Sequence, residues 1–221
     1  EILSKLLVLA EAKEGQIYAY LDSIESRTLD FSSDKFIRNS INKINKGEEV
    51  NQTVDALNKY LIGDKQSLDK AIAGILILDL NGTVVASTNN EEIGRDESDD
   101  EYFIKGKQEV FSIEVSGHEH FGLNKPFAVS APLINKETGN LQGVIVNIFD
   151  ITKIRDIISG QFQLDKGALS GMEGHAKTLK IYLVDKEKKI FVDSQNLNKN
   201  SNADEAAVVD ILPVQKCLEN K

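Results

Sequence analysis

The stretch from Ala73 to Asn90 constrains the fold more than any other part of the sequence. Residues Gly74 to Leu80 form an almost unbroken aliphatic run of strand length. Asn81-Gly82 follows this run, where a tight turn needs positive φ angles, and Thr83 to Thr88 is rich in β-branched residues. These features predict a β-hairpin. Because both arms carry too few charges to face water on two sides, other elements must cover them.

Composition limits the classes of protein to which the chain can belong. Its 221 residues are 41% hydrophobic, which is enough for the core of one large domain or of two small ones. A net charge of -9 argues against a nucleic-acid surface, which would need clustered Lys and Arg. The single cysteine, Cys217, excludes an internal disulfide and a cysteine-based zinc site.

The chain begins at Glu1 without an initiator Met. Its longest aliphatic run is far shorter than the roughly 18 residues that a membrane helix requires. We therefore expect an excised fragment or a mature chain, and not a whole membrane protein.

The first sixty residues predict three helices. A long helix is expected from Ile2 to about Arg27, and its apolar stripe either packs along its own domain or forms a dimer seam. Ser32 or Ser33 offers an N-cap for a second helix from Asp34 to Lys46, which Gly47 ends. A third helix is predicted from Glu49 to Ile62, ending at Gly63. The stripe of the long helix recurs every seven residues, at Leu3, Ala10, Ile17, Ile24 and Phe31.

The residues after the hairpin predict more sheet. Ser98-Asp99-Asp100-Glu101 has the form of a capping box, which predicts a short helix that carries Tyr102 and Phe103. Three strands are expected at 109–116, 126–134 and 141–150, and a turn-rich hexapeptide makes the last two antiparallel. Asp150 and Thr152 then cap a helix from Ile151 to Ser159. Together these elements predict an α+β domain with five antiparallel strands.

The hairpin pattern recurs near residue 190. The alignment pairs Asp185 with Asp79, Ile190 with Val84, Ser194 with Thr88 and Asn196 with Asn90. A single hairpin match is a weak sign of a repeat. Only one helical segment follows it, residues 206–219, so the second copy is expected to be smaller or truncated.

Four motifs make the chain resemble the Cache sensor family, specifically the double-Cache type found in bacterial and archaeal histidine kinases, chemoreceptors and cyclic-dinucleotide enzymes. They occur in the family's order and spacing, cover Ala71 to Ser159 well, and match Leu179 to Asn196 moderately. The motifs are residues 77–88, Ile93-Gly94-Arg95-Asp96 leading to Tyr102-Phe103, Ser130-Ala131-Pro132-Leu133, and residues 141–146 with Asp150 closing the strand.

The resemblance implies an extracytoplasmic sensor domain without catalytic activity of its own. It implies a helical stalk over 1–63, a membrane-distal PAS-like domain over 64–160, and an incomplete or reduced membrane-proximal PAS-like module over 161–221. It also implies a homodimer formed through the N-terminal helix, flanking transmembrane helices, and a small-molecule ligand. No cofactor and no nucleic-acid partner are expected.

The implied ligand pocket lies between the inner face of the distal sheet and the segment around Tyr102. Asp150 matches an aspartate that ends the last strand in amino-acid-binding relatives, whereas Asp99, Asp100 and Glu101 replace an expected basic residue. A ligand carboxylate would meet acidic neighbours there, so we expect a ligand other than an α-amino acid. The candidate ligand-binding residues are Tyr102, Phe103, Phe111, Ser130 and Asp150.

Each candidate also has a purely structural interpretation. Asp150 holds a ligand amine or caps the helix that follows. Tyr102 donates its hydroxyl to a ligand, or buries its ring and keeps its hydroxyl in water.

His118 and His120 share one face of an extended segment and could present two imidazoles to a metal ion. The sequence places no third ligand, so an exposed loop is favoured. The acidic cluster from Asp96 to Glu101 complements a helix N-terminus better than it forms a calcium loop.

Two classes of function remain. The first is a sensory module, most like that of a sensor histidine kinase, with a chemoreceptor or a diguanylate cyclase as alternative parents. The second is a structural or protein-docking PAS-like domain whose interior is filled by Phe103, Phe111 and Phe127. The sequence contains no glycine-rich phosphate loop and no G-x-S-x-G motif, so an enzyme is a distant third.

Overall fold

The structure, a computed structural model, describes residues 2–115, 121, 123, 126–150, 152–159, 182–184 and 190–193. The chain divides into two compact units. The sheet unit comprises Leu21–Ile151, and the terminal unit comprises Glu1–Tyr20 with Thr152–Lys221. The long helix α1 (Ile2–Ser33) contributes to both units.

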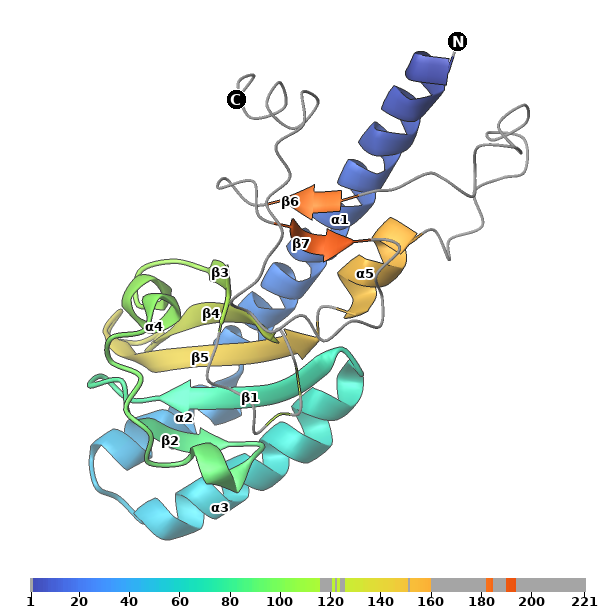
Figure 1. Cartoon of the computed structure of the whole chain (residues 1–221). Coiled ribbons are helices and arrows are strands. Elements are labelled where there is room, and N and C mark those ends of the chain that lie inside the picture. The colour runs from blue at the N-terminus through green and yellow to red at the C-terminus, as the bar shows by residue number, and fades with distance from the viewer. Residues whose placement is uncertain are drawn as a thin grey trace. The chain divides into compact units, whose positions relative to one another are not determined.

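The sheet unit contains a five-stranded antiparallel sheet with the strand order β2-β1-β5-β4-β3 (Figure 1). This arrangement confirms the predicted α+β fold. The two long central strands have the bounds that the sequence predicts, and the third strand is shorter than predicted. The strands are β1 (Ile72–Leu78), β2 (Val84–Ser87), β3 (Phe111–Glu114), β4 (Pro126–Ile134) and β5 (Leu141–Asp150).

The predicted hairpin is confirmed, but its turn differs from the prediction. Leu78 pairs with Val84, and only Gly82 in the loop has a positive φ, of 91°. Asp79 organises the loop, because its Oδ1 accepts hydrogen bonds from the amides of Asn81 and Thr83, each at 2.9 Å. Within the Asn-Gly pair only Gly82 has the predicted positive φ, and an aspartate side chain supplies hydrogen bonds to the turn.

Three helices cover one face of the sheet, here called the helix face. They are the second half of α1, α2 (Lys35–Asn45) and α3 (Val50–Tyr60). Asn147 of β5 reaches α1, donating from Nδ2 to the Thr28 hydroxyl at 3.0 Å. Large aliphatic and aromatic side chains with exposed fractions of 3% or less fill this contact, among them Ile24, Phe31, Ile37, Ile41, Leu57, Ile75, Ile77, Val129, Ile145 and Phe149.

The helix boundaries correct several predictions. Helix α1 continues to Ser33, so neither Ser32 nor Ser33 caps α2. Asp34 is the N-cap, and its Oδ1 accepts from the amides of Phe36 at 2.7 Å and Ile37 at 3.2 Å. Gly47, with φ of 73°, follows α2 as predicted. After α3 the chain continues through a π-helical turn, Leu61–Lys65, and a 3-10 turn, Gln66–Leu68, so the predicted stop at Gly63 is wrong.

The predicted capping box before the short helix is also wrong. Helix α4 (Glu101–Gly106) has Asp100 as its N-cap residue, and the amide of Ser98 instead donates to Asp96 Oδ1 at 3.0 Å. The preceding segment runs beside β2, where the Val84 amide donates to the Arg95 carbonyl at 3.0 Å. Because the chain is held extended beside β2 to this point, the helix begins later than the sequence motif suggests.

The described part of the terminal unit contains the first half of α1, α5 (Thr152–Ser159), β6 (Tyr182–Val184) and β7 (Ile190–Asp193). Lys13 of α1 is 4% exposed and donates to the carbonyl of Ile157 in the last turn of α5. Burial lowers the pKa of Lys13. The terminal unit is thus held together in part by a lysine that bonds to the carboxyl end of a helix.

The second hairpin is confirmed over its paired residues. Val184 pairs with Ile190 after an irregularity at Leu183, just as Leu78 pairs with Val84 after an irregularity at Ile77. The predicted helix at 206–219 and Cys217 lie outside the described residues. The division of the chain at residues 63 and 160, and a second PAS-like module, stay predictions.

Within the part of the chain that the structure describes, no helix combines the length and the apolar character needed to cross a membrane.

Candidate functional site

The second face of the sheet, here called the α4 face, carries the candidate ligand-binding residues. Helix α4 packs on this face, and partly buried side chains from β3 and from the residues after it surround the packed cluster. The buried members are Leu76, Leu78, Val84, Tyr102, Phe103, Ala128, Val144, Val146 and Ile148, and the partly buried ones are Phe111, Ile113, Val115, Phe121 and Leu123.

Three of the candidate residues lie where α4 touches the sheet. Gly106 of α4 is so close to β4 that an added Cβ would be 2.5 Å from Ser130 Oγ. Ser130 is fully buried and donates to the Phe111 carbonyl at 3.3 Å. Tyr102 and Phe103 are also buried, with exposed fractions of 1% and 2%. This half of the α4 face is a packed helix-sheet contact.

The Tyr102 hydroxyl is held by a buried charge network. It donates to Glu97 Oε2 at 2.7 Å, and Glu97 Oε1 lies 2.9 Å from Arg95 Nε. Arg95 also donates from Nη1 to Glu92 Oε2 at 3.1 Å. Glu92 and Glu97 are 0% and 4% exposed, so the shared guanidinium offsets two buried carboxylates. Burial and the Glu97 carboxylate raise the pKa of Tyr102 far above its usual value.

The sequence did not predict this network. The signal available there is the alternation of acid, base and acid at positions 92, 95 and 97, but many surface segments share it. The network ties α4 to the segment beside β2. The Tyr102 hydroxyl therefore positions α4 through Glu97.

In the other half of the α4 face, small residues of the sheet lie under an aromatic ring. Across the sheet, Gly74 of β1 and Ala128 of β4 flank Ile148 of β5 in one paired row, so two of three neighbouring side chains are small or missing. The ring of Phe121 lies against the backbone of Gly74, because an added Cβ there would be 2.0 Å from Phe121 Cε1. We call this site, made by Gly74, Ala128 and Ile148 under the Phe121 ring, the Gly74 recess.

Asp150 stands at the edge of the Gly74 recess. It follows Ile148 by two residues on β5, so the strand period puts both side chains on the same face about 7 Å apart along the strand. Its amide donates to the Ala71 carbonyl at 3.0 Å, and its side chain is half-buried. Of the candidate residues, Asp150 is therefore the one nearest along β5 to the Gly74 recess.

The remaining candidate, Phe111, lies under a lysine, and so does Phe103. Lys105 Nζ lies 4.4 Å from the centre of the Phe111 ring, and Lys107 Nζ lies 4.4 Å from that of Phe103. Such contacts contribute about 0.5–1 kcal/mol at exposed sites. Lys105 also pairs with Glu101 at 2.6 Å.

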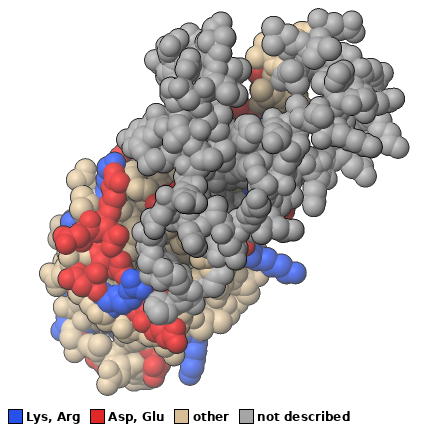
Figure 2. Space-filling model, in the orientation of Figure 1, with Lys and Arg blue, Asp and Glu red and all other residues tan. Residues whose placement is uncertain are grey.

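The charge around α4 is acidic. Figure 2 shows acidic side chains gathered over α4. Asp96, Asp99 and Glu101 in and before this helix are exposed. Hydrogen bonds from Ser98 lower the pKa of Asp96. An anion approaching this side of the sheet unit would meet these carboxylates as well as Lys105 and Lys107.

The metal hypothesis finds no support among the residues that the structure describes. His118 and His120 lie outside them. Within the described ranges, no group of three or more His, Cys, Asp or Glu side chains is arranged to hold a metal ion. The two histidines remain a prediction from the sequence.

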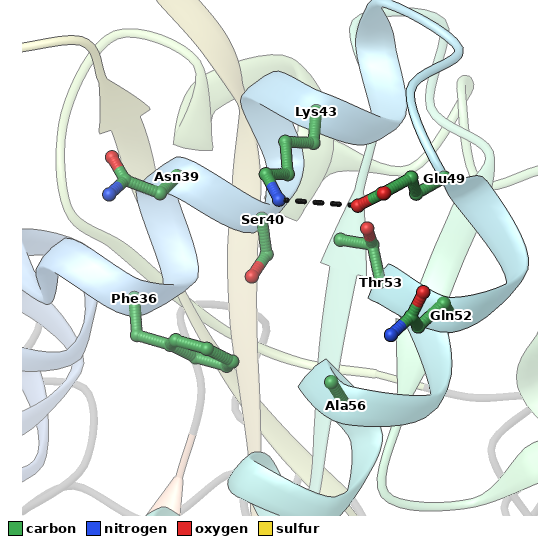
Figure 3. A pocket seen from close by; sticks show the side chains of 8 residues that line it. All are labelled: Phe36, Asn39, Ser40, Lys43, Glu49, Gln52, Thr53 and Ala56. Carbon is green, nitrogen blue, oxygen red and sulfur yellow. Dashed lines mark ion pairs between the residues drawn. The ribbon is translucent and has the colours of Figure 1, made fainter.

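A groove lies between α2 and α3. It has a volume of about 300 Å³, and none of the candidate residues lines it. Figure 3 shows the Phe36 ring at one end and the ion pair of Lys43 with Glu49, 3.6 Å apart, at the other. The groove is open to solvent. Its lining residues are Phe36, Asn39, Ser40, Lys43, Glu49, Gln52, Thr53 and Ala56.

Solved structures of sensor domains resemble this chain. The sensor domain of the Vibrio cholerae histidine kinase DctB has a TM-score of 0.65 and 18% identity, over 88% of this chain and 67% of that domain. The Campylobacter jejuni chemoreceptor Tlp3 ligand-binding domain in complex with 4-methylisoleucine has a TM-score of 0.60 and 13% identity, over 96% of this chain and 75% of that domain. No protein-family model and no curated protein matches the sequence.

Proposed function

Because the chain has the fold of the Cache sensor domains, we propose that it is the extracytoplasmic ligand-binding part of a transmembrane signalling receptor. A small molecule binds in the Gly74 recess beside Asp150. The half of the α4 face under α4 itself serves as a rigid wall, because Tyr102, Phe103 and Ser130 are already packed against one another.

The single observation that carries this proposal is the row of Gly74, Ile148 and Ala128. A glycine inside a strand weakens the strand unless another group approaches the backbone closely. Here the Phe121 ring makes that approach, on the face that carries the candidate residues, and Asp150 follows Ile148 by two residues. Ligand pockets are mostly apolar with a few placed polar groups, and this row with Asp150 fits that description.

The parent protein is a sensor histidine kinase in this proposal, since the DctB sensor domain is the neighbour with a TM-score of 0.65. A chemoreceptor or a diguanylate cyclase would use the domain in the same way. The chain is anchored by transmembrane helices outside this sequence and dimerises through α1. Ligand binding shifts the receptor between states only by its different affinity for each state.

A thermal-shift screen of small metabolites tests the binding function. A ligand at 100 times its Kd stabilises the fold by about 2.7 kcal/mol, a shift of several degrees in Tm. The shift should disappear in Asp150→Ala and in Gly74→Val, which change the rim and fill the recess. Asp99→Asn is the matched control, because it removes an exposed carboxylate outside the recess and should keep the shift.

The alternative is a protein-docking domain that binds no small molecule. The packed contact of Gly106 with Ser130 favours it, because part of the α4 face is already filled by the chain's own atoms. A screen without any hit, or hits that both recess variants keep, would contradict the sensor proposal and favour this alternative.

A further inference from the structure

We propose that the groove between α2 and α3 is a separate binding site, and that it takes a neutral ring with several hydroxyl groups, such as a monosaccharide. The groove lies within the sheet unit, and none of the candidate residues of the α4 face lines it. The inference does not rest on the proposed function, because it concerns a different cavity and different residues.

The groove has the size of a site for one small ring. Its volume is about 300 Å³. Ligand pockets of proteins have volumes of about 300–1,000 Å³, so this groove is at the lower end of that range. A molecule with one six-membered ring and a few substituents fits such a space.

Two buried hydroxyl groups face the groove. Ser40 of α2 and Thr53 of α3 are only 5% and 8% exposed, and both line the groove. Figure 3 shows both side chains in the space between the two helices. Among the residues that the structure describes, neither side chain makes a hydrogen bond. Because buried polar groups are nearly always hydrogen-bonded, the partners of these hydroxyls must come from the groove.

The Phe36 ring forms an apolar wall that is already in place. It packs on Tyr60 with the ring centres 4.6 Å apart, and the Tyr60 hydroxyl donates to Asp34 Oδ2 at 2.8 Å. Oδ1 of the same carboxylate accepts from the Phe36 amide at 2.7 Å. Asp34 therefore holds the ring and the start of α2 together, although the ring is 41% exposed. A ring fixed in this way offers the C–H groups of a sugar an apolar contact without having to be ordered first.

The other end of the groove carries two charges that offset each other. Lys43 Nζ lies 3.6 Å from Glu49 Oε2, and both side chains are exposed. Glu49 has a left-handed backbone, with φ of 47°, and its carboxylate does not cap α3. The ion pair therefore places one group of donors and one group of acceptors at this end. Because its net charge is zero, the groove favours a neutral ligand over an ion.

The lining as a whole selects a ligand with many hydrogen-bonding groups. Six of the eight lining residues have polar side chains, whereas ordinary ligand pockets are mostly apolar. A ligand that covers polar groups must replace their hydrogen bonds to water, or it loses affinity. Sugar hydroxyls both donate and accept, and the C–H groups of the sugar ring suit the Phe36 wall. A monosaccharide therefore fits this groove better than an aliphatic or a purely aromatic molecule.

Titration of the whole chain with D-glucose, D-galactose and D-mannose, followed by the amide resonances in two-dimensional NMR spectra, tests the proposal. Benzyl alcohol, which has an apolar ring and one hydroxyl, is the reference probe. We expect at least one sugar to shift the amides of Ser40 and Thr53 and to leave the amide of the exposed Asp99 unchanged. That sugar should bind more tightly than benzyl alcohol.

Four variants locate the binding. Thr53→Val keeps the shape of the side chain and removes its hydroxyl, so it should weaken sugar binding about fivefold. Phe36→Ala removes the apolar wall and should weaken binding at least about tenfold, whereas Phe36→Tyr keeps a ring and should keep the affinity. Ser33→Ala is the matched control, because this exposed hydroxyl lies outside the groove and already donates to the Asp30 carbonyl at 2.8 Å. It should leave the affinity unchanged.

Thermal unfolding without a ligand separates a binding role of Thr53 from a structural one. A hydroxyl without a partner in the chain adds nothing to stability, so Thr53→Val should unfold at the same Tm as the unaltered chain or at a higher one. A lower Tm would mean that the hydroxyl supports the fold and would overturn the proposal. If Phe36→Ala does not fold, the affinity and the Tm of Thr53→Val decide. No shift with any of the three sugars, equal affinities for the unaltered chain and Thr53→Val, or benzyl alcohol as the tightest probe would also overturn it.

Discussion

The two faces of the five-stranded sheet are built from different residues. On the helix face, large side chains such as Ile75, Ile77 and Ile145 interlock with three helices and are fully buried. On the α4 face, Gly74 and Ala128 interrupt the apolar surface, and two of the rings around it, Phe111 and Phe121, are only partly buried. One face is thus covered by three helices, and the other has small residues under partly buried rings.

Two strand glycines show the same difference. A Cβ added at Gly143 would be 2.2 Å from the carbonyl oxygen of Leu78, which is backbone and cannot move without moving β1. The atoms nearest to a Cβ added at Gly74 belong to the Phe121 ring, which is a side chain. Gly143 is therefore required by the packing of the strands, whereas Gly74 is required by the approach of a side chain.

The difference between the two faces predicts its largest effect on the free energy of unfolding when one isoleucine on each face is replaced. Ile77 on the helix face is fully buried, and Ile113 on the α4 face is only partly buried. Ile77→Ala should lower the free energy of unfolding by about 4 kcal/mol, because it removes buried surface and leaves a cavity that the helices cannot fill. Ile113→Ala should cost about 1 kcal/mol, since part of its surface is already in water. Urea unfolding monitored by circular dichroism measures both.

Equal losses in the free energy of unfolding for the two substitutions would contradict the difference in packing between the two faces. A much larger cost for Ile113 would mean that the α4 face is a closed core, which would favour the docking alternative over the sensor.

The helix face also has an ionic contact that pH can probe. Lys65 Nζ lies 2.7 Å from Asp34 Oδ2, and the Tyr60 hydroxyl donates to the same oxygen at 2.8 Å. Burial alone would raise the pKa of Asp34, but hydrogen bonds from Lys65 and Tyr60 outweigh it and hold that pKa below its usual value. Lys65→Met should therefore lower the free energy of unfolding by about 3 kcal/mol at pH 7.

The sign of the pH effect follows from the depressed pKa. The contribution of Asp34 is fully present above its unfolded pKa of about 3.9 and is lost as the pH falls through its lower folded value. The cost of Lys65→Met should therefore be smaller at pH 3 than at pH 7. Lys43→Met is the matched control, because its exposed pair with Glu49 is expected to contribute about 0.5 kcal/mol. A cost for Lys65→Met that does not change with pH would contradict the ionic origin.

The sequence predicted the sheet better than the site. Two apolar runs joined by a turn-rich hexapeptide identified β4 and β5 with their bounds, because such strand signals are local and extend over nine or ten residues. Caps were predicted less well, since Ser32 and Asp34 are both good N-cap residues and only tertiary packing carries α1 on to Ser33. A cap depends on where the previous element ends, which the sequence pattern does not state.

The candidate site was predicted as a set of residue types on one face, and the structure places Tyr102, Phe103 and Ser130 together there. Their partners could not be predicted. The pairing of Tyr102 with Glu97, and of Phe121 with Gly74, depends on how loops far apart in sequence return to the sheet. Whether these residues contact a ligand stays a proposal.

The smallest expected effect separates a positioning role of Tyr102 from a ligand contact. Because burial and the Glu97 carboxylate raise the pKa of Tyr102, its hydroxyl should stay protonated in the folded chain at pH 11. Tyr102→Phe should therefore leave the tyrosinate absorbance of the folded protein at pH 11 unchanged, and should lower it by one tyrosine only after unfolding in urea at that pH. The variant should cost about 1 kcal/mol of stability, because it leaves Glu97 with one partner fewer. A folded protein that loses one tyrosinate on this substitution would place the hydroxyl in contact with water, and the α4 face would then be open to solvent at the helix.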